Sequence, residues 1–110
     1  MKNRIEEIFD ELKIPYRYKL FKNDIPPVPF AVWQIEAESF SGSDTEWRIK
    51  ESDYTIELYT NEKDFALEER IENLLPAPEF EKTEFYITQQ NLFSITYKFK
   101  IYTKRGKNNG

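Results

Sequence analysis

The chain has 110 residues, and 20 acidic against 16 basic side chains give it a formal net charge of −4. This length is typical of one small domain, and a protein whose main task is to bind nucleic acid is more often basic. The chain contains no cysteine and no histidine, which excludes a disulfide framework and removes the commonest general base and metal ligand.

The first predicted element is a short helix over residues 3–13. Asn3 and Glu6 have the spacing of a capping box, in which each side chain accepts a hydrogen bond from the other residue's backbone. Pro15 ends the helix, because the residue before a proline avoids the helical region. The apolar stripe of this helix consists of Ile5, Ile8, Phe9 and Leu12.

A hairpin is predicted next, with strands over residues 30–39 and 47–59. Before it, residues 16–21 alternate and allow either a short edge strand or an extended loop. The prolines in residues 23–29 predict an extended linker inside the domain, because they lack N–H donors. The residues of the first strand that we expect to face the core are Ala31, Trp33, Ile35 and Ala37.

The second strand of this hairpin changes its alternation partway along. Trp47 and Ile49 are odd-numbered, whereas the later apolar positions are even-numbered. A bulge at residues 51–53 would restore one buried face. Alternatively, Trp47 and Ile49 lie on a flap beyond the core. The even-numbered apolar positions are Tyr54, Ile56 and Leu58.

A second helix is predicted between Asp64 and Leu75, where a proline follows. The Asp64 carboxylate can accept a free backbone N–H of the first turn, which makes it a good N-cap. We assign Glu68, Glu69 and Glu72 to the solvated face of this helix. The apolar stripe that faces the sheet consists of Leu67, Ile71, Leu74 and Leu75.

Two more strands are predicted over residues 79–88 and 92–102. Phe85 and Ile87 share one face of the first of them. The second has the cleanest alternation in the chain, typical of a strand with one buried face. Its inward positions are Phe93, Ile95, Tyr97, Phe99 and Ile101.

The order of these elements is α-β-β-α-β-β. It predicts an α+β fold, in which an antiparallel-rich sheet carries two helices packed on one face. We expect one domain over residues 1–103 and a flexible basic tail over residues 104–110.

No motif for catalysis stands out. The serines have no histidine partner, and no acidic segment has the spacing of a calcium loop. We therefore expect no enzyme activity, no cofactor and no metal site. No stretch approaches the ~20 apolar residues of a membrane-spanning helix, so we expect no membrane partner. The only basic cluster, Lys98 to Lys107, makes a small nucleic-acid-binding αβ module the alternative function.

Candidate interface residues lie in the segments that the core does not need. Residues 39–46 form a polar hairpin tip that is long for such a loop. Trp47 is out of phase with its strand, and the basic tail can order on contact. The predicted subunit-interface residues are Ser41, Asp44, Glu46, Trp47, Lys104, Arg105 and Lys107.

Four segments carry a resemblance to a known group of proteins. They are IPYRYKLF after the first helix, the proline-rich IPPVPFAVWQIEAES, the strand–helix unit YTIELYTNEKDFALEERIENLL, and the last strand LFSITYKFKIYTKR. Together they make the chain resemble the small tail-completion proteins of long-tailed phages and prophages of Gram-positive bacteria. These proteins are tail terminators or tail-to-head joining components.

The resemblance implies a structural virion-assembly protein without catalytic residues. The tail-completion proteins form homo-oligomeric rings, typically hexamers, at the end of the tail tube. The implied partners are other copies of the chain, the tail tube and the head-connector proteins, and nucleic acid would be met only as DNA passing through the ring. The implied location is the host cytoplasm during assembly and the virion afterwards. A small enzyme or an inhibitor of the immunity type is a further alternative, favoured only by the acidity of the chain.

Overall fold

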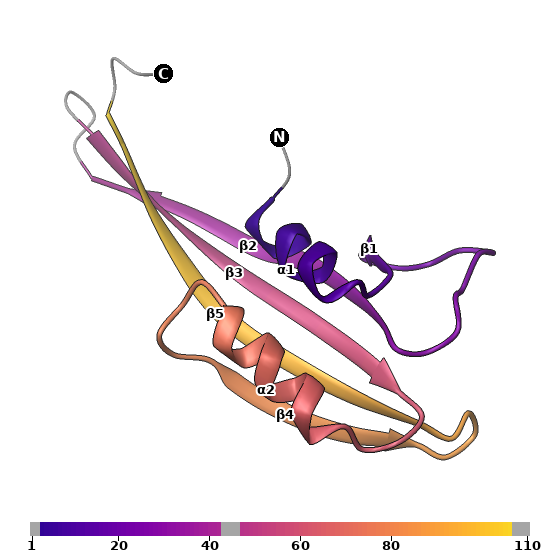
Figure 1. The fold of residues 1–110 in the computed structure, drawn as a ribbon. Helices are drawn as coiled ribbons and strands as arrows, with labels where there is room; N and C mark the ends of the chain where they lie inside the picture. Colours follow the sequence, from indigo (N-terminus) through magenta and orange to yellow (C-terminus); the bar gives the residue numbers. More distant parts are fainter. Residues whose placement is uncertain (1–2, 43–46, 107–110) are drawn as a thin grey trace.

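The computed structural model describes residues 3–42 and 47–106, and it shows a five-stranded sheet with two helices on one face (Figure 1). The strand order is β1-β2-β3-β5-β4, and every neighbouring pair is antiparallel except the parallel pair β1–β2. The predicted α+β class is therefore confirmed. The elements are α1 (Arg4–Leu12), β1 (Tyr16–Tyr18), β2 (Phe30–Ser41), β3 (Trp47–Thr60), α2 (Phe65–Leu74), β4 (Glu81–Ile87) and β5 (Leu92–Gly106).

Both helices begin at the caps that the sequence predicts. The Asn3 side chain accepts a hydrogen bond from the Ile5 N–H at 2.8 Å, and the Glu6 carboxylate accepts one from the Asn3 N–H at 3.3 Å. At α2, the Asp64 carboxylate accepts a hydrogen bond from the Leu67 N–H at 3.0 Å. Each cap satisfies a backbone donor that a helix of nine or ten residues would otherwise leave free.

The core lies between the helices and the even-numbered face of β3. Ile56 and Leu58 on this strand are fully buried, and Ile5 of α1 and Ile71 of α2 close over them. The inward face predicted for β5 is correct, since Ile95, Tyr97 and Phe99 are buried and Phe93 and Ile101 pack at the margin.

Aromatic rings tie the strands together on the helix side of the sheet. The ring centroids of Tyr18 and Trp33 lie 4.7 Å apart, those of Trp33 and Tyr54 6.2 Å apart, and those of Tyr54 and Phe99 5.6 Å apart. The row therefore crosses β1, β2, β3 and β5. Large rings in contact at these distances bury much area per residue, which suits a small core.

We predicted a bulge at residues 51–53 of β3, but the structure has it in β2. Ile35 pairs with Tyr54 and Ala37 with Asp53, so Glu36 is the extra residue. β3 pairs with β5 without a break from Trp47 to Thr60, which keeps its pleat regular. The irregularity is therefore taken by β2, whose other side is largely free. As a result Ala37 turns away from the core and is exposed, contrary to prediction.

Three strands continue beyond the helices as an arm, which we define as residues 36–42 of β2 and its end, 47–53 of β3 and 100–106 of β5 (Figure 1). The molecule is accordingly elongated, with extents of 53 × 28 × 24 Å. β2 runs to Ser41, into the predicted loop, and β5 runs to Gly106, into the predicted tail. Regular secondary structure thus continues past residue 103. Ile49 agrees with the alternative prediction of a flap beyond the core, because it lies on the arm, on the face opposite Tyr54.

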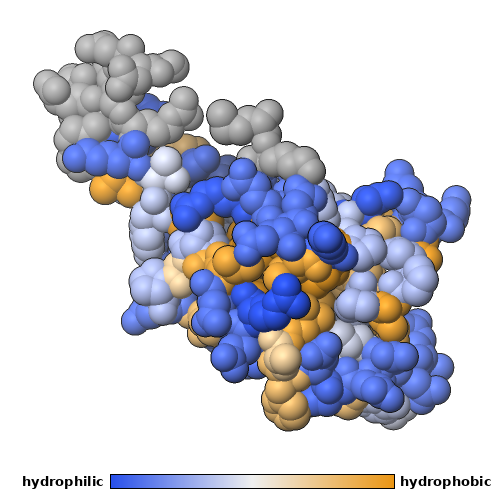
Figure 2. All heavy atoms as spheres, viewed as in Figure 1, coloured by the Kyte–Doolittle hydropathy of each residue, from blue (hydrophilic) through white to orange (hydrophobic). Residues whose placement is uncertain are grey.

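The helix-bearing face has its apolar surface in the middle. Figure 2 shows hydrophobic residues gathered in the furrow between α1 and α2, with hydrophilic residues around them. Ile8 and Leu74 line this furrow from the two helices, and Arg4, Glu7 and Glu11 border it.

Candidate subunit interface

The structure brings several of the predicted interface residues together at the arm. Ile49 pairs with Ser41 of β2 on one side and with Lys104 of β5 on the other. Trp47 and Arg105 belong to the paired parts of β3 and β5. We predicted a loop and a tail here, whereas the structure has three paired strands. The predicted residues that lie outside the described part of the chain are Asp44, Glu46 and Lys107.

Both outer edges of the arm lack a strand partner among the described residues. β1 pairs with β2 only at Ala31–Trp33, so residues 36–41 of β2 have no neighbour on that side. β4 pairs with β5 only as far as Lys98, so residues 99–106 of β5 are also unpaired on their outer side. An unpaired edge presents a row of free backbone N–H and C=O groups, which can template pairing with another strand.

The two edges carry opposite charge. The unpaired part of β2 contains Glu36 and Glu38 and no basic residue. The unpaired part of β5 contains Lys100, Lys104 and Arg105 and no acidic residue. The arm therefore has an acidic edge and a basic edge on its two sides.

The central strand of the arm pairs with charges on both edges. Lys100 Nζ lies 2.8 Å from a carboxylate oxygen of Asp53 and 3.0 Å from one of Glu51. The ammonium donates hydrogen bonds to both carboxylates, and these bonds, to Asp53 first and then to Glu51, raise the pKa of Lys100 above its ordinary value. On the other side, Glu38 accepts a hydrogen bond from the Ser52 hydroxyl at 2.9 Å and lies 3.6 Å from Lys50 Nζ. The arm is thus held by polar contacts more than by burial.

Each edge strand also exposes one large aromatic side chain. Phe40 of β2 is 56% exposed and Tyr102 of β5 is 63% exposed. Phe40 pairs with Lys50 and so lies on the helix side of the arm, while Tyr102 pairs with Glu51 and lies on the opposite side. Exposed rings on unpaired strands are typical of interaction surfaces.

An apolar groove of about 370 Å³ begins where β4 stops pairing with β5. The connector between α2 and β4 forms one wall and β5 forms the other. Its apolar lining residues are Ala77, Pro78, Phe80, Phe99 and Tyr102.

A buried ionic cluster beside α2 contradicts the assignment of Glu68 to the solvated face. The Glu68 side chain is 2% exposed, and its carboxylate oxygens lie 2.7 Å from Lys63 Nζ and 2.8 Å from Lys82 Nζ. Lys82 also lies 2.6 Å from Glu72. The reason is that Lys82 pairs with the inward-facing Tyr97, which places it on the helix side of β4. Glu68 and Glu72 therefore face β4, whereas Glu69 is exposed to water as predicted.

Hydrogen bonds and burial shift the pKa values of the groups in this cluster. Burial alone would raise the pKa of Glu68, but hydrogen bonds from Lys63 and Lys82 outweigh it and lower that pKa. Burial, with the adjacent Glu72 carboxylate, raises the pKa of the Tyr97 phenol well above its ordinary value, and this phenol donates a hydrogen bond to Glu72 at 2.8 Å. Every one of these groups has a partner within the cluster. We interpret it as a clamp that holds α2 on the sheet.

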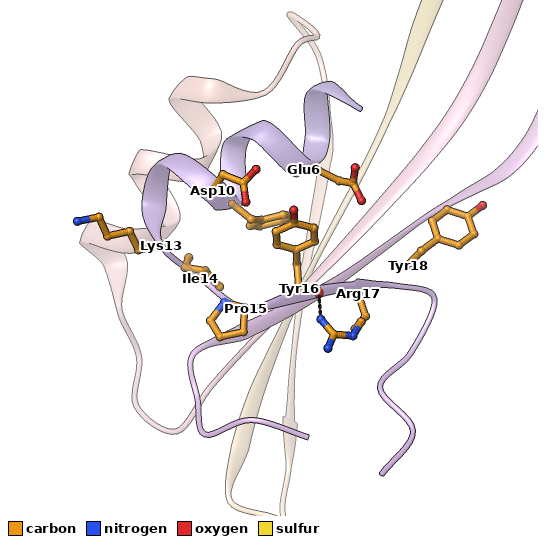
Figure 3. A pocket seen from close by; sticks show the side chains of 9 residues that line it. Glu6, Asp10, Lys13, Ile14, Pro15, Tyr16, Arg17 and Tyr18 are labelled. Carbon is orange, nitrogen blue, oxygen red and sulfur yellow. Dashed lines mark hydrogen bonds between the residues drawn. The ribbon is translucent and has the colours of Figure 1, made fainter. Parts of the chain in front are cut away.

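A hollow of about 550 Å³ lies between α1 and β1 (Figure 3). Tyr16, which stacks on Phe9 with ring centroids 5.9 Å apart, lies at its centre. The polar groups around it already have partners within the fold. Glu6 belongs to the capping box, and Arg17 binds the Tyr16 carbonyl at 2.9 Å and Asp24 at 2.8 Å. This arrangement stabilises the turn after α1.

Comparison with protein-family models and with curated proteins gives no match for the chain. Within residues 3–42 and 47–106, no group of three or more metal-ligating side chains could hold a metal ion. In the same part of the chain, no helix is both long enough and apolar enough to cross a membrane.

Proposed function

We propose that this chain is a structural virion-assembly protein that forms a ring of copies, typically a hexamer, at the end of a phage tail tube. In this function it is a tail terminator or a tail-to-head joining protein. The observation that carries the proposal is the arm, whose two different unpaired edges project past the core. The resemblance described above supplies the biological setting.

A closed ring needs two different contact surfaces on each subunit, because every copy uses one surface toward the copy before it and another toward the copy after it. The acidic β2 edge and the basic β5 edge are two such surfaces on opposite sides of one rigid sheet. Neither surface requires a catalytic residue, a cofactor or a metal ion. Assembly would take place in the host cytoplasm, and the protein would then stay at the tail end of the virion.

The alternative, nucleic-acid binding through Lys98 to Lys107, has less support from the geometry. Lys100 already contacts the Glu51 and Asp53 carboxylates of its own chain, and these would compete with a phosphate for it. A lysine or arginine strengthens binding to DNA when it neutralises a phosphate and releases the counterion that was condensed there. We therefore expect DNA to be a passive cargo of the ring and not a bound ligand.

The test is an assembly experiment. Purified protein is measured by light scattering over a range of concentrations, and is then mixed with tail tubes of the phage or prophage that encodes it. We expect a ring-sized oligomer and electron micrographs with extra density at one end of each tube. A protein that never binds tube ends would overturn the proposal. A salt-dependent gel shift with DNA in that case would favour the nucleic-acid alternative.

A further inference from the structure

We propose that copies of this chain join head-to-tail by parallel strand pairing, in which the free β5 edge of one copy (residues 99–106) pairs with the free β2 edge of the next (residues 36–41). This pairing deepens the proposed ring function by naming the surfaces that join, and it needs no phage component to occur. It would extend the three-stranded arms into one continuous sheet.

The direction of pairing follows from the topology. β2 and β5 are both antiparallel to β3 and therefore run in the same direction. If rotation about an axis roughly along the strands relates neighbouring copies, β5 meets the next β2 in parallel, and the helices of all copies stay on one face. A two-fold dimer would instead pair identical edges in antiparallel fashion. The two arrangements therefore use different pairs of edges.

The charges favour the mixed pairing over either identical pairing. Joining β2 to β2 would place the Glu36 and Glu38 carboxylates of two copies together. Joining β5 to β5 would do the same with Lys100 and Lys104. Like charges on directly neighbouring strands are destabilising, whereas opposite charges are favourable. The pairing of β5 with β2 avoids both repulsions, because the strand register places Glu38 on the helix side of the joined sheet and Lys100 and Lys104 on the opposite side.

The side chains on the two edges also fit each other. On the helix side, Phe40 of β2 would lie beside Ile101 and Thr103 of the neighbouring β5. On the opposite side, Tyr102 of β5 would lie beside the small side chains of Ala37 and Ser39. Each exposed ring thus meets a site that can cover it. The bulge at Glu36 limits the contact to the arm, because β2 leaves the regular ladder there.

Single cysteines can test which edges meet, because the natural chain contains none. Ser39→Cys marks the β2 edge and Lys104→Cys marks the β5 edge, and the strand register places both on the face away from the helices. Each variant is treated with a short bis-maleimide alone and as an equal mixture with the other. Glu69→Cys, at an exposed position on α2, replaces either partner as the control.

We expect the mixture of Ser39→Cys and Lys104→Cys to crosslink about tenfold more than either variant alone or than the control mixtures. The double variant should give a ladder of crosslinked oligomers that ends at the ring size. Crosslinking of either variant mainly to itself would overturn the proposal in favour of a two-fold dimer. Absence of mixed crosslinks above the control would overturn it altogether.

A charge exchange gives a second and independent measurement. One variant carries Glu36→Lys and Glu38→Lys, and the other carries Lys100→Glu and Lys104→Glu. Each should stay monomeric alone, while an equal mixture should form alternating rings, because unlike edges then meet at every junction. A β2-reversed variant that still self-associates like the natural protein would overturn the proposal. Mixed crosslinks without tube binding would support the edge pairing and refute the tail function. Tube-bound rings without mixed crosslinks would support the tail function and refute the edge pairing.

Discussion

Replacing Glu68 with glutamine should destabilise the fold by about 2 kcal/mol at pH 7. Removal of one partner from a fully buried ion pair costs ~3–5 kcal/mol. Here the side chains of Lys63 and Lys82 are 23% and 35% exposed, and they keep Glu84 and Glu72 as partners. Water and these second partners therefore screen the loss, which reduces the expected cost to about 2 kcal/mol. That is a large share of a domain stability of ~5–15 kcal/mol.

The effect should depend on pH in one direction. The folded pKa of Glu68 lies below its ordinary value of 4.5. A carboxylate with a lowered pKa contributes stability that is fully present above the unfolded pKa and is lost as the pH falls through the folded pKa. The difference between the natural protein and Glu68→Gln should therefore be constant near neutral pH and should shrink below about pH 4.5.

Urea denaturation of the natural protein and of Glu68→Gln, at pH 7 and at about pH 3, measures the loss of stability and its dependence on pH. Glu69→Gln is the matched control, because Glu69 is the next residue on α2, is exposed, and should change stability by less than about 0.5 kcal/mol. The clamp interpretation is refuted if Glu68→Gln behaves like this control at pH 7. It is also refuted if the two proteins differ as much at low pH as at neutral pH.

Two further changes probe the packing of the sheet. Leu58→Ala removes a fully buried side chain at the centre of β3 and should cost ~2–5 kcal/mol in chemical denaturation, whereas a cost below ~0.5 kcal/mol would mean that this face is not the core. Tyr97→Phe removes the hydrogen bond to Glu72 and should cost about 1.5 kcal/mol at pH 7. Because the pKa of Tyr97 is raised, the contribution of this hydrogen bond is fully present below pH 10.0 and should decline at higher pH. Denaturation of both proteins at pH 7 and pH 11 tests this, and an equal cost of Tyr97→Phe at the two pH values would contradict it.

Local signals in the sequence were sufficient for where the helices begin and for the inward face of β5. The caps at Asn3 and Asp64 depend only on residues within one turn, so their spacing predicts them directly. The alternation in β5 is equally local, and its inward residues are those in contact with the core. The class of fold follows from the order of these elements.

Features that depend on a distant strand were not predictable in the same way. The parity change in β3 indicates an irregularity, but the unbroken pairing with β5 decides that β2 carries it at Glu36. The burial of Glu68 depends on Lys82, which the register of β4 against β5 brings to the helix side. At the candidate interface, Ser41 and Lys104 were identified together, but as parts of a loop and a tail. Only the pairing of both with Ile49 shows that they flank the same residue of β3, one on each side.

The arm also has a consequence for the order of folding. The β3–β5 pairs run from Thr60–Phe93 near the helices to Trp47–Gly106 at the far end of the arm, so pairing can proceed outward from the core. Closing the chain between Trp47 and Gly106 costs less than about 0.6 kcal/mol more entropy than closing it between Thr60 and Phe93, because the loop is less than twice as long. We expect the arm to form last because the residues from Ala37 to Ser41 bury almost no surface, so pairing there gains little free energy.

Segments with little burial open locally at a free energy below that of global unfolding. In a single copy, the backbone amides of the arm should therefore exchange their hydrogens with solvent sooner than those of Ile56 and Leu58. Joining two copies along the arm would remove this difference, because each edge would gain a hydrogen-bonded neighbour. Assembly would then complete the folding of the arm, and exchange protection there would rise with protein concentration while protection in the core stayed the same.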